Sequence, residues 1–585
     1  MTTLNPALSF RIGGGWHGVG RNLFIIIPVG LTLWLIIVPL IELIQASFQT
    51  GSPGMPGYFT LSKYQTAYFT PLTYTTFLNT AIFAALATSF ALAIAILSAW
   101  LIERTDLPLR NVAWAFLLVP MAMPGILYAI AWVYLLGPEA GLINIFLRNL
   151  LSYFGLELAR GPINIFSLGG LIFLEGLRGV TTVFLMIVGC FRMMDPALEE
   201  AARVSGASAR HTIVRVTLPI LFPALLSAWI FNFMSSLESL EIPMIVGLPA
   251  KIYVFSSYVY FSTQKSLPPD YGLAAALGVV FLVVSTGLVL IYWRLLGGAE
   301  RFATVTGKGY RPRVTRLGIW KYPAFGVFIL YFTLTILVPV LTLVYRSLLP
   351  YLMRPSLQVL DLVSLKNYRS VLTESELLGA TINTLIIMAA TASVTMMLSI
   401  TVSWVIVRTK ARGRTALDIM TFMTHAIPGV TIAVALVYLY LRAPLKYFPI
   451  YGTVWIIILG LVAGYLSFGV RSMNAAMTHI HRELEEAAHT SGAGRARTLW
   501  KVTLPLLLPA FVSGWVWVAT HSMRAFSIPL MLKTRKNRPL SVVLWDLWDR
   551  GESGEAAALG VLLIITLLVV VVGGRWLVAR LSRQE

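Results

Sequence analysis

The sequence EEAARVSGASARHTIVRVTLPILFP at residues 199–223 occurs a second time in this chain, as EEAAHTSGAGRARTLWKVTLPLLLP at residues 485–509. The two copies align without a gap, and fourteen of their twenty-five positions are identical. Both copies are polar and lie between long apolar segments. Apolar segments resemble one another by composition alone, whereas matched Glu-Ala-Ala, Gly and Leu-Pro positions in a polar loop indicate a shared constraint. We therefore expect something outside the membrane to contact both loops.

The composition is that of a polytopic membrane protein. Of the 585 residues, 57% are hydrophobic and 12% are charged, and the mean hydropathy is +0.79, which is too apolar for a soluble protein of this size. The formal net charge of +20 then fits basic cytoplasmic loops and does not call for nucleic acid. The single cysteine, Cys190, excludes an internal disulfide and a metal site built from several cysteines.

A helix that crosses the membrane needs roughly 20 apolar residues, and by that rule each half of the chain contains six. The spans expected in the first half are 23–44, 77–101, 112–136, 164–190, 221–245 and 272–294. Those expected in the second half are 323–345, 381–407, 417–441, 453–475, 507–531 and 556–579. The expected fold class is an all-α polytopic membrane protein with about 12 transmembrane helices.

The duplication extends beyond the two loops. Further matched pairs are Asn79-Thr80 with Asn383-Thr384, Trp100 and Arg104 with Trp404 and Arg408, Pro124-Gly125 with Pro428-Gly429, and Ile242-Pro243 with Ile528-Pro529. Because six is an even number, both halves enter the membrane in the same sense, as two parallel six-helix repeats around a pseudo-twofold axis. The expected domains are a first repeat at 1–296, a basic cytoplasmic linker at 297–322 and a second repeat at 323–585. Such an axis favours a pathway between the halves.

Basic residues predict the orientation. They gather on the side that carries both repeated loops and both termini, and by the positive-inside rule that side is cytoplasmic. One loop disagrees, because it places four cations on the expected outer side: Lys533, Arg535, Lys536 and Arg538. Acidic residues nearby offset part of this charge: Asp546, Asp549, Glu552 and Glu555.

Each repeated loop has the composition of a short helix followed by a turn. Glu199 and Glu200 lie in the first turn, where the helix dipole favours carboxylates. Ala201 and Ala202 leave a flat face that a partner can approach, and Gly206 permits a sharp change of direction. The second copy has Glu485, Glu486, Ala487, Ala488 and Gly492 at these positions. An ordinary connector is the alternative for one copy, but two matched copies favour a shared docking surface.

The pattern Glu-Ala-Ala, three residues, Gly, nine residues, an aliphatic residue, any residue and Leu-Pro resembles the cytoplasmic signature of permeases in binding-protein-dependent ABC importers. The residues that match it are Glu200, Ala201, Ala202, Gly206, Val216, Leu218 and Pro219, and Glu486, Ala487, Ala488, Gly492, Val502, Leu504 and Pro505. The resemblance covers nearly the whole chain, as two fused permease domains. The flanking sequences MDPALEEAARVSGAS and LESLEIPMIVGLPAKIYVF look most like those of the fused ferric-iron permeases. Polyamine, thiamine and phosphonate permeases are close relatives.

The resemblance implies a multi-pass permease subunit of the bacterial cytoplasmic (inner) membrane, without a cofactor. In that family the repeated loop is the coupling helix that docks in a cleft on the ATPase. The implied partners are two copies of an ABC ATPase subunit, a periplasmic or extracellular solute-binding protein and membrane lipid. The implied solute is ferric iron, although in related importers the binding protein chooses the solute.

Two other classes fit less well. A secondary transporter also has twelve spans, but the common sugar-porter type carries a Gly-rich, Asp-Arg loop where this chain has Glu103-Arg-Thr-Asp-Leu-Pro. A membrane enzyme is not supported, because the sequence shows no nucleophile, HExxH or other catalytic or metal motif. Gly307-Lys308 is followed by Gly309 rather than by Ser or Thr, so it is no phosphate loop. ATP must then be hydrolysed by another chain.

Charged residues within spans are the candidates for a pathway or gate, because burying them in lipid is costly. Glu175 and Arg178 are three residues apart and can pair along one helical face. Glu238 and Glu241 have the same spacing, and their counterparts 286 residues later are Arg524 and Ser527, with His521 one turn before. The alternative role for these charges is packing or anchoring of helix ends.

Two further expectations follow from the pseudo-symmetry. Equivalent positions near a twofold axis approach one another. We therefore expect Glu238 and Arg524, which have opposite charges, to meet at the outer constriction, directly or through water. His425, the equivalent of Met121, is interpreted as part of a helix irregularity rather than as a ligand.

Overall fold

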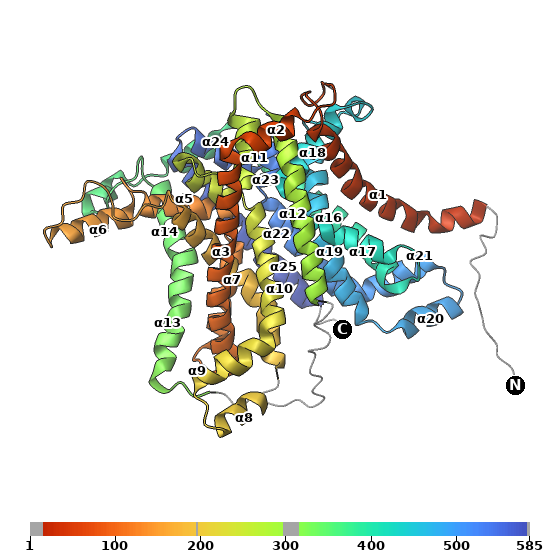
Figure 1. The fold of residues 1–585 in the computed structure, drawn as a ribbon, viewed down its shortest axis with the longest axis horizontal. Helices are drawn as coiled ribbons and strands as arrows, with labels where there is room; N and C mark the ends of the chain where they lie inside the picture. The colour runs from red at the N-terminus through yellow and green to blue at the C-terminus, as the bar shows by residue number, and fades with distance from the viewer. Residues whose placement is uncertain (1–15, 56, 195–196, 297–314, 582–585) are drawn as a thin grey trace.

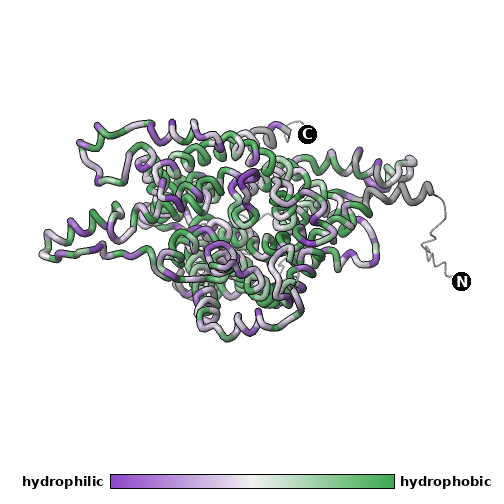
Figure 2. Tube along the Cα trace, turned by 90° about the horizontal axis from the view of Figure 1, so that it is seen from above, coloured by the Kyte–Doolittle hydropathy of each residue, from purple (hydrophilic) through white to green (hydrophobic). Residues whose placement is uncertain are grey.

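The computed structural model describes residues 16–55, 57–194, 197–296 and 315–581 (Figure 1). Within these ranges the chain consists of helices and loops, with extended pairing limited to two isolated β-bridges. Ten of the described helices are long and apolar enough to cross a membrane, or up to twelve if each of two bent helix pairs in the first half counts as one span. These pairs are Arg110–Ala122 with Gly125–Leu136, and Pro243–Ala250 with Phe255–Lys265. Figure 2 shows hydrophobic residues along these helices. The predicted all-α polytopic class is confirmed.

Ten of the expected spans correspond to observed helices. Those of the first half are α1 (Trp16–Ser47), α3 (Pro71–Arg104), α7 (Leu168–Met193), α10 (Leu218–Glu238) and α12 (Tyr271–Leu296). Those of the second half are α16 (Ser375–Arg408), α19 (Val454–Thr478), α22 (Leu504–Met523), α25 (Ser553–Leu581), and the continuous span formed by α13 (Lys321–Phe332) and α14 (Val338–Ser347).

The third expected span of each half is broken, which corrects the single helices predicted at 112–136 and 417–441. The first half has α4 (Arg110–Leu118) and α5 (Gly125–Leu136), and the chain bends by 99° between them. The second half has α17 (Arg414–Met423) and α18 (Gly429–Leu441). Proline lacks an amide hydrogen and disfavours the helical conformation in the residue before it. Accordingly, Met123 and Ile427, which precede the matched prolines, have extended ψ angles of 123° and 113°.

The fifth span of each half is shorter than predicted. The helices α10 and α22 end at Glu238 and Met523, and a second short helical segment follows each of them. These segments are η3 (Pro243–Gly247) and α23 (Ser527–Met531). Glu238 and Arg524 therefore lie at helix ends, where the backbone changes direction, and not on the face of a continuous helix.

The first span of each half packs against the other half. Helix α1 packs along α12 and also along α16 and α18, and Glu42 Oε1 forms an ion pair with Arg442 Nη1 at 2.9 Å. Helix α13 packs on α4, where the rings of Phe116 and Phe332 stack with centroids 4.5 Å apart. Figure 1 shows α1 beside the second-half helices and α13 beside the first-half helices.

This exchange interlocks the two halves of the chain, because α1 and α13 each pack against helices of the other half. The division into repeats at 1–296 and 323–585 stays a prediction. Residues 297–314 of the expected linker lie outside the described part of the chain. Just after them, the Leu317 amide donates to Asp106 Oδ1 at 2.7 Å, which attaches the end of the linker to the first half.

The two repeated loops lie at the same end of the molecule. They contain α8 (Ala197–Val204) and α9 (Ala209–Thr212) in the first copy, and α20 (Arg482–Thr490) and α21 (Arg495–Thr498) in the second. In Figure 1 these helices occupy the lower half of the view, and α2 (Ser62–Phe69), α11 (Phe255–Tyr260) and α24 (Leu540–Asp549) lie at the top. Both halves therefore run in the same sense.

Candidate functional site

The glycine of each repeated loop adopts a backbone conformation that is open to it because it has no Cβ. Gly206 and Gly492 have φ angles of +85° and +83°, a left-handed region that residues with a Cβ rarely adopt. In each copy the turn is closed in the same way: the Ala207 amide donates to the Ala202 carbonyl at 3.0 Å, and the Ala493 amide donates to the Ala488 carbonyl at 2.9 Å. This is the glycine-dependent end of a helix.

The first glutamate of each pair points inward. Glu199 Oε1 accepts a hydrogen bond from the Thr217 hydroxyl at 2.8 Å, and Glu485 Oε1 accepts one from the Thr503 hydroxyl at 3.1 Å. All four residues are buried. Each bond joins the loop helix to the turn before α10 or α22, so it fixes the loop against the helix that follows.

The remaining predicted docking residues lie on the outside as far as the structure describes them. Ala201, Glu486 and Ala487 are exposed, Ala202 and Ala488 are partly buried, and both glycines are exposed. The side chain of Glu200 lies outside what the structure describes. The two glutamates of a pair therefore have different roles, which the sequence pattern alone did not distinguish.

A matched arginine fixes the other end of each loop. Arg104 Nη2 donates to the Met194 carbonyl at 2.8 Å, and Arg408 Nη2 donates to the carbonyls of Met477 and Ile480 at 2.9 and 2.7 Å. Arg408 Nε also lies 3.2 Å from Glu485 Oε1 in a buried ion pair. Sequence reasoning did not assign these arginines to the loops, although their match across the repeats was the available signal.

A cavity of about 250 Å³ lies between the halves. Both halves line it, and five of the six predicted pathway residues are among its lining: Arg178, Glu238, Glu241, His521 and Arg524. The sixth, Glu175, is buried behind Arg178. The structure therefore brings together charges that are up to 349 positions apart in the sequence, since 524 − 175 = 349.

The first-half wall of the cavity is acidic. The predicted pairing of Glu175 with Arg178 is confirmed: Glu175 Oε1 lies 2.6 Å from Arg178 Nη2, and Glu175 Oε2 accepts from the Ser239 hydroxyl at 3.0 Å. Arg178 Nη1 also lies 3.9 Å from Glu241 Oε2. One cation is thus shared between two carboxylates, and Glu238 supplies a third carboxylate to this side.

The second-half wall carries a cation that bonds across to the first half. Arg524 Nη1 donates to the carbonyls of Met121 and Met123 at 2.5 and 3.3 Å, and Arg524 Nη2 lies 2.7 Å from His521 Nε2. His521 Nδ1 lies 2.8 Å from the Trp517 carbonyl. Because a carbonyl only accepts, Nδ1 donates, and Nε2 is then the acceptor for Arg524.

We expected Glu238 and Arg524 to meet directly or through water. Among the described residues no ion pair joins them directly, and the Arg524 guanidinium donates instead to the carbonyls at the break in the first half's third span. The meeting through water stays a prediction. Both residues still line the one cavity. His425, equivalent to Met121, lies in the short turn before the matching break and also lines the cavity, with its ring stacked on Phe231 at 4.5 Å.

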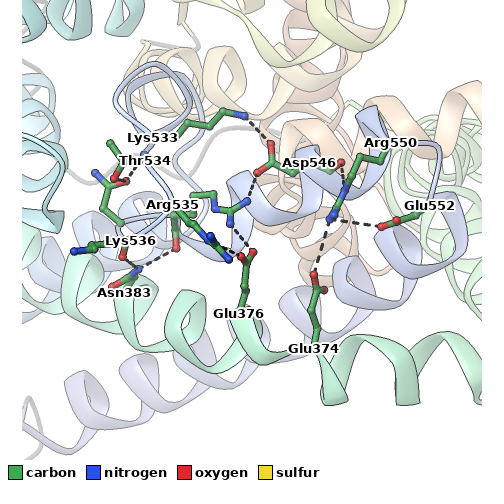
Figure 3. Close-up of polar contacts among 12 residues, drawn as sticks. Glu374, Glu376, Asn383, Lys533, Thr534, Arg535, Lys536, Asp546, Arg550 and Glu552 are labelled. Atoms are coloured by element: carbon green, nitrogen blue, oxygen red, sulfur yellow. Dashed lines mark hydrogen bonds and ion pairs between the residues drawn. The ribbon is translucent and has the colours of Figure 1, made fainter.

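Ion pairs offset part of the positive charge of the basic loop that disagreed with the orientation rule (Figure 3). Asp546 lies 2.6 Å from Lys533 and 3.0 Å from Arg538. Glu376, at the start of α16, contacts Arg538 and lies 3.5 Å from Arg535. Asp546 was expected to offset this charge, but Glu376 was not, because it is more than 150 residues away in sequence. These pairs lie at the end away from the repeated loops.

Comparison with known proteins places the chain in a transport class. Residues 395–584 match the family model described as "Binding-protein-dependent transport system inner membrane component". The chain is 24% identical over 508 residues to a ferric transport system permease protein of Actinobacillus pleuropneumoniae, covering 84% of this chain and 69% of the relative. It is 26% identical over 458 residues to a putative ferric transport system permease protein of Haemophilus influenzae, covering 77% and 68%.

A solved structure, a bacterial alginate ABC transporter in complex with an alginate-bound periplasmic protein, is also similar to part of this chain. The identity is 18%, the match covers 45% of this chain and 95% of that one, and the TM-score is 0.38.

The resemblance drawn from the two repeated loops is confirmed by these matches: residues 395–584 fit the model of the permease component of binding-protein-dependent transport systems, and most of the chain is similar to ABC importer permeases. It is similar over most of its length to permeases named for ferric transport. As a multi-pass inner membrane component it is a transporter subunit.

Proposed function

We propose that this permease forms the solute pathway of an ABC importer and that its two repeated loops couple the pathway to two copies of a separate ATPase subunit. The observation that carries the proposal is the shared loop geometry. Each loop has a left-handed glycine, an inward glutamate held by a threonine and an outer surface of small residues, and both lie at one end of the molecule.

The helices that follow the loops give a direct mechanical connection to the cavity. Helix α10 begins just after Thr217 and ends at Glu238, and α22 begins just after Thr503 and ends beside Arg524. A helix of this length rises roughly 30 Å, which is the thickness of the hydrocarbon core. A displacement of either loop is passed through the glutamate–threonine bond to a helix whose far end lines the cavity.

Arg524 is the proposed gate of this pathway. Its bonds to Met121 and Met123 join the second half to the first across the cavity wall. Closing of the ATPase dimer moves the two loops relative to one another, and separation of the halves breaks these bonds. The acidic first-half wall, with Glu238 and Glu241, then attracts a cationic solute. Catalysis of ATP hydrolysis belongs to the partner subunit.

The proposed solute is ferric iron, delivered by an extracytoplasmic binding protein. The names of the two permeases cited above support this assignment. Polyamine, thiamine and phosphonate remain alternatives within the same permease class, and a secondary transporter is a remote alternative. The acidic wall favours a cation over phosphonate.

The test is reconstitution with the binding protein and ATPase that co-purify with the chain. ATP-dependent uptake of radioactive ferric iron into proteoliposomes is expected, with spermidine, thiamine and phosphonate as competitors. Uptake of one competitor instead of iron would keep the importer and replace the solute. Uptake without any ATPase, driven by an ion gradient, would overturn the importer.

The proposed topology places both termini and both loops in the cytoplasm. In a Cys190→Ser background, Lys308→Cys is expected to react only with reagent on the cytoplasmic side and Lys536→Cys only with reagent outside. Lys308 lies outside the described residues, whereas Lys536 lies in the loop of Figure 3. Labelling of Lys536→Cys from the cytoplasm would contradict this topology.

A further inference from the structure

The loop that lengthens the first half forms a projecting arm. We define the arm as residues 137–167, between α5 and α7; it contains the amphipathic helix α6 (Leu142–Ser152). Figure 1 shows α6 running across the direction of the long helices and away from the bundle, well above α8. In Figure 2 the same arm is the leftmost segment and stands clear of the other helices.

Side chains on the polar face of α6 form hydrogen bonds to the segments before and after this helix. Asn144, Arg148 and Ser152 are four residues apart and share that face. Asn144 is buried; its Nδ2 donates to the carbonyls of Leu136, Gly137 and Ile163 at 2.8, 3.0 and 2.7 Å. Its Oδ1 accepts from the Ile163 amide at 3.1 Å, and Arg148 Nη1 donates to the Ala159 carbonyl at 3.2 Å. The arm is therefore an ordered hairpin rather than a loose loop.

The opposite face of α6 is uncovered and mostly apolar, with the exposed Asn149 as its one polar residue. Phe146 and Leu150 are one helical turn apart and are 65% and 43% exposed. The exposed rings of Tyr153 and Phe154 continue this surface, at 88% and 75% exposure. A contiguous exposed apolar surface on an ordered element marks a binding surface.

We propose that this apolar face lies in the headgroup–acyl boundary of the membrane, at the end of the spans away from the repeated loops. The arm leaves the bundle between α5 and α7, so the lipid that surrounds these helices also reaches the base of the arm. A helix with one apolar and one polar face lies in the plane of that boundary, and a tyrosine ring is enriched at the same depth.

The charges of the arm specify the kind of lipid interaction. Glu139 and Glu157 balance Arg148 and Arg160, so the arm has no net charge. Arg160 is in addition 3.5 Å from Glu139. Binding is thus driven by apolar area and aromatic side chains, not by attraction to anionic headgroups.

The test uses the full-length permease in phosphatidylcholine nanodiscs, with Cys190→Ser as background. Phe146→Cys, on the apolar face of α6, and Ser152→Cys, about 120° away on its polar face, are each labelled with an environment-sensitive fluorophore. We expect blue-shifted emission at position 146 and water-like emission at position 152. Lipids with a quencher near the carbonyl should quench position 146 more strongly than lipids quenched near the chain end.

A matched control comes from the second half, where the corresponding loop lacks the arm. Tyr447 is exposed there, and Tyr447→Cys should be quenched less than Phe146→Cys. Adding phosphatidylglycerol should leave the quenching at position 146 unchanged.

Three outcomes overturn the proposal. One is water-like emission and no lipid quenching at position 146. Another is equal quenching at positions 146 and 152. The last is a blue shift at position 146 that appears only when the binding protein or a second copy of the chain is added, which would assign the face to a protein partner.

Discussion

The two repeated loops and the two walls of the cavity differ in how closely they follow the internal duplication. At the loops, the left-handed glycine and the glutamate–threonine bond recur at equivalent positions with nearly equal geometry. A matched arginine also bonds to backbone carbonyls of both loops, and Arg408 in addition pairs with Glu485. At the cavity, the positions equivalent by the same duplication carry different residues: Arg524 is the equivalent of Glu238, and Ser527 is the equivalent of Glu241. The two loops thus have the same glycine, glutamate and threonine at equivalent positions, whereas the two walls of the cavity have residues of different charge.

This difference separates two kinds of constraint. Two loops that dock on two copies of one partner must present the same surface twice. A pathway for one solute has no such requirement, and an asymmetric pair of walls lets one side attract the solute while the other holds the halves together. Sequence identity between the two loops therefore fits a surface that binds the same partner twice. The sequence difference between the two walls fits a pathway that one solute follows.

The largest expected effect is loss of coupling at the loops. Glu200→Arg combined with Glu486→Arg should abolish ATP-driven uptake and leave the membrane fold intact, because removing a charged interface contact costs about 2–5 kcal/mol. Uptake and stimulated ATPase activity measure the effect. Glu483→Arg is the control, since Glu483 is also exposed on α20 but lies outside the signature. Normal coupling in the double variant would contradict the docking assignment.

The next effect distinguishes the two inward glutamates. Glu485→Ala removes a hydrogen bond and leaves the buried Arg408 without its carboxylate, a loss of about 3–5 kcal/mol. Glu199→Ala removes a hydrogen bond to a charged group, which is worth about 1.5–3 kcal/mol. Thermal unfolding in detergent should therefore show a larger drop in Tm for Glu485→Ala. Equal drops would mean that the Arg408 ion pair adds nothing.

Closure of the cavity should depend on the bonds that Arg524 makes to the first half, independently of Glu238. Arg524→Gln should raise basal ATPase activity, because hydrogen bonds from a charged donor stabilise the closed state by about 1.5–3 kcal/mol. Arg524→Lys, which keeps the charge and a donor, should restore part of the closure. Among the described residues no ion pair joins Glu238 to Arg524, which bonds instead to two backbone carbonyls. Adding Glu238→Gln should therefore change the ATPase activity additively, as for residues without a shared partner. A strongly non-additive result would show that the two charges interact through water.

The smallest effect tests the equivalence of the loops. Gly206→Ala and Gly492→Ala should each destabilise their loop by about 1–2 kcal/mol, because a residue with a Cβ is strained at positive φ. Among the atoms that the structure describes, none obstructs a Cβ at either position, so the two losses should be alike in thermal unfolding. Gly494→Ala, in the same loop but without positive φ, should be nearly neutral. Unequal losses for the matched pair would indicate that the loops have diverged in conformation.

Residues close in sequence carried most of the correct predictions. Helical spans follow from apolar length, because every backbone amide in lipid must be satisfied within its own helix. The pairing of Glu175 with Arg178 follows from helical spacing, and the turn at Gly206 from the freedom of glycine. The repeated signature likewise identified the permease class without any coordinates.

Other features depended on contacts between distant segments. Residues up to several hundred positions apart meet in three places. They meet where α1 and α13 pack against the other half, in the lining of the cavity, and in the bonds from Arg524 to Met121 and Met123. Apolar length alone could not show that a proline divides a span and frees carbonyls to accept those bonds. The amino-acid sequence by itself determined the helices and the duplicated loops, because these rest on local spacing. Only the tertiary structure decided which charges meet, because that depends on how the two halves pack.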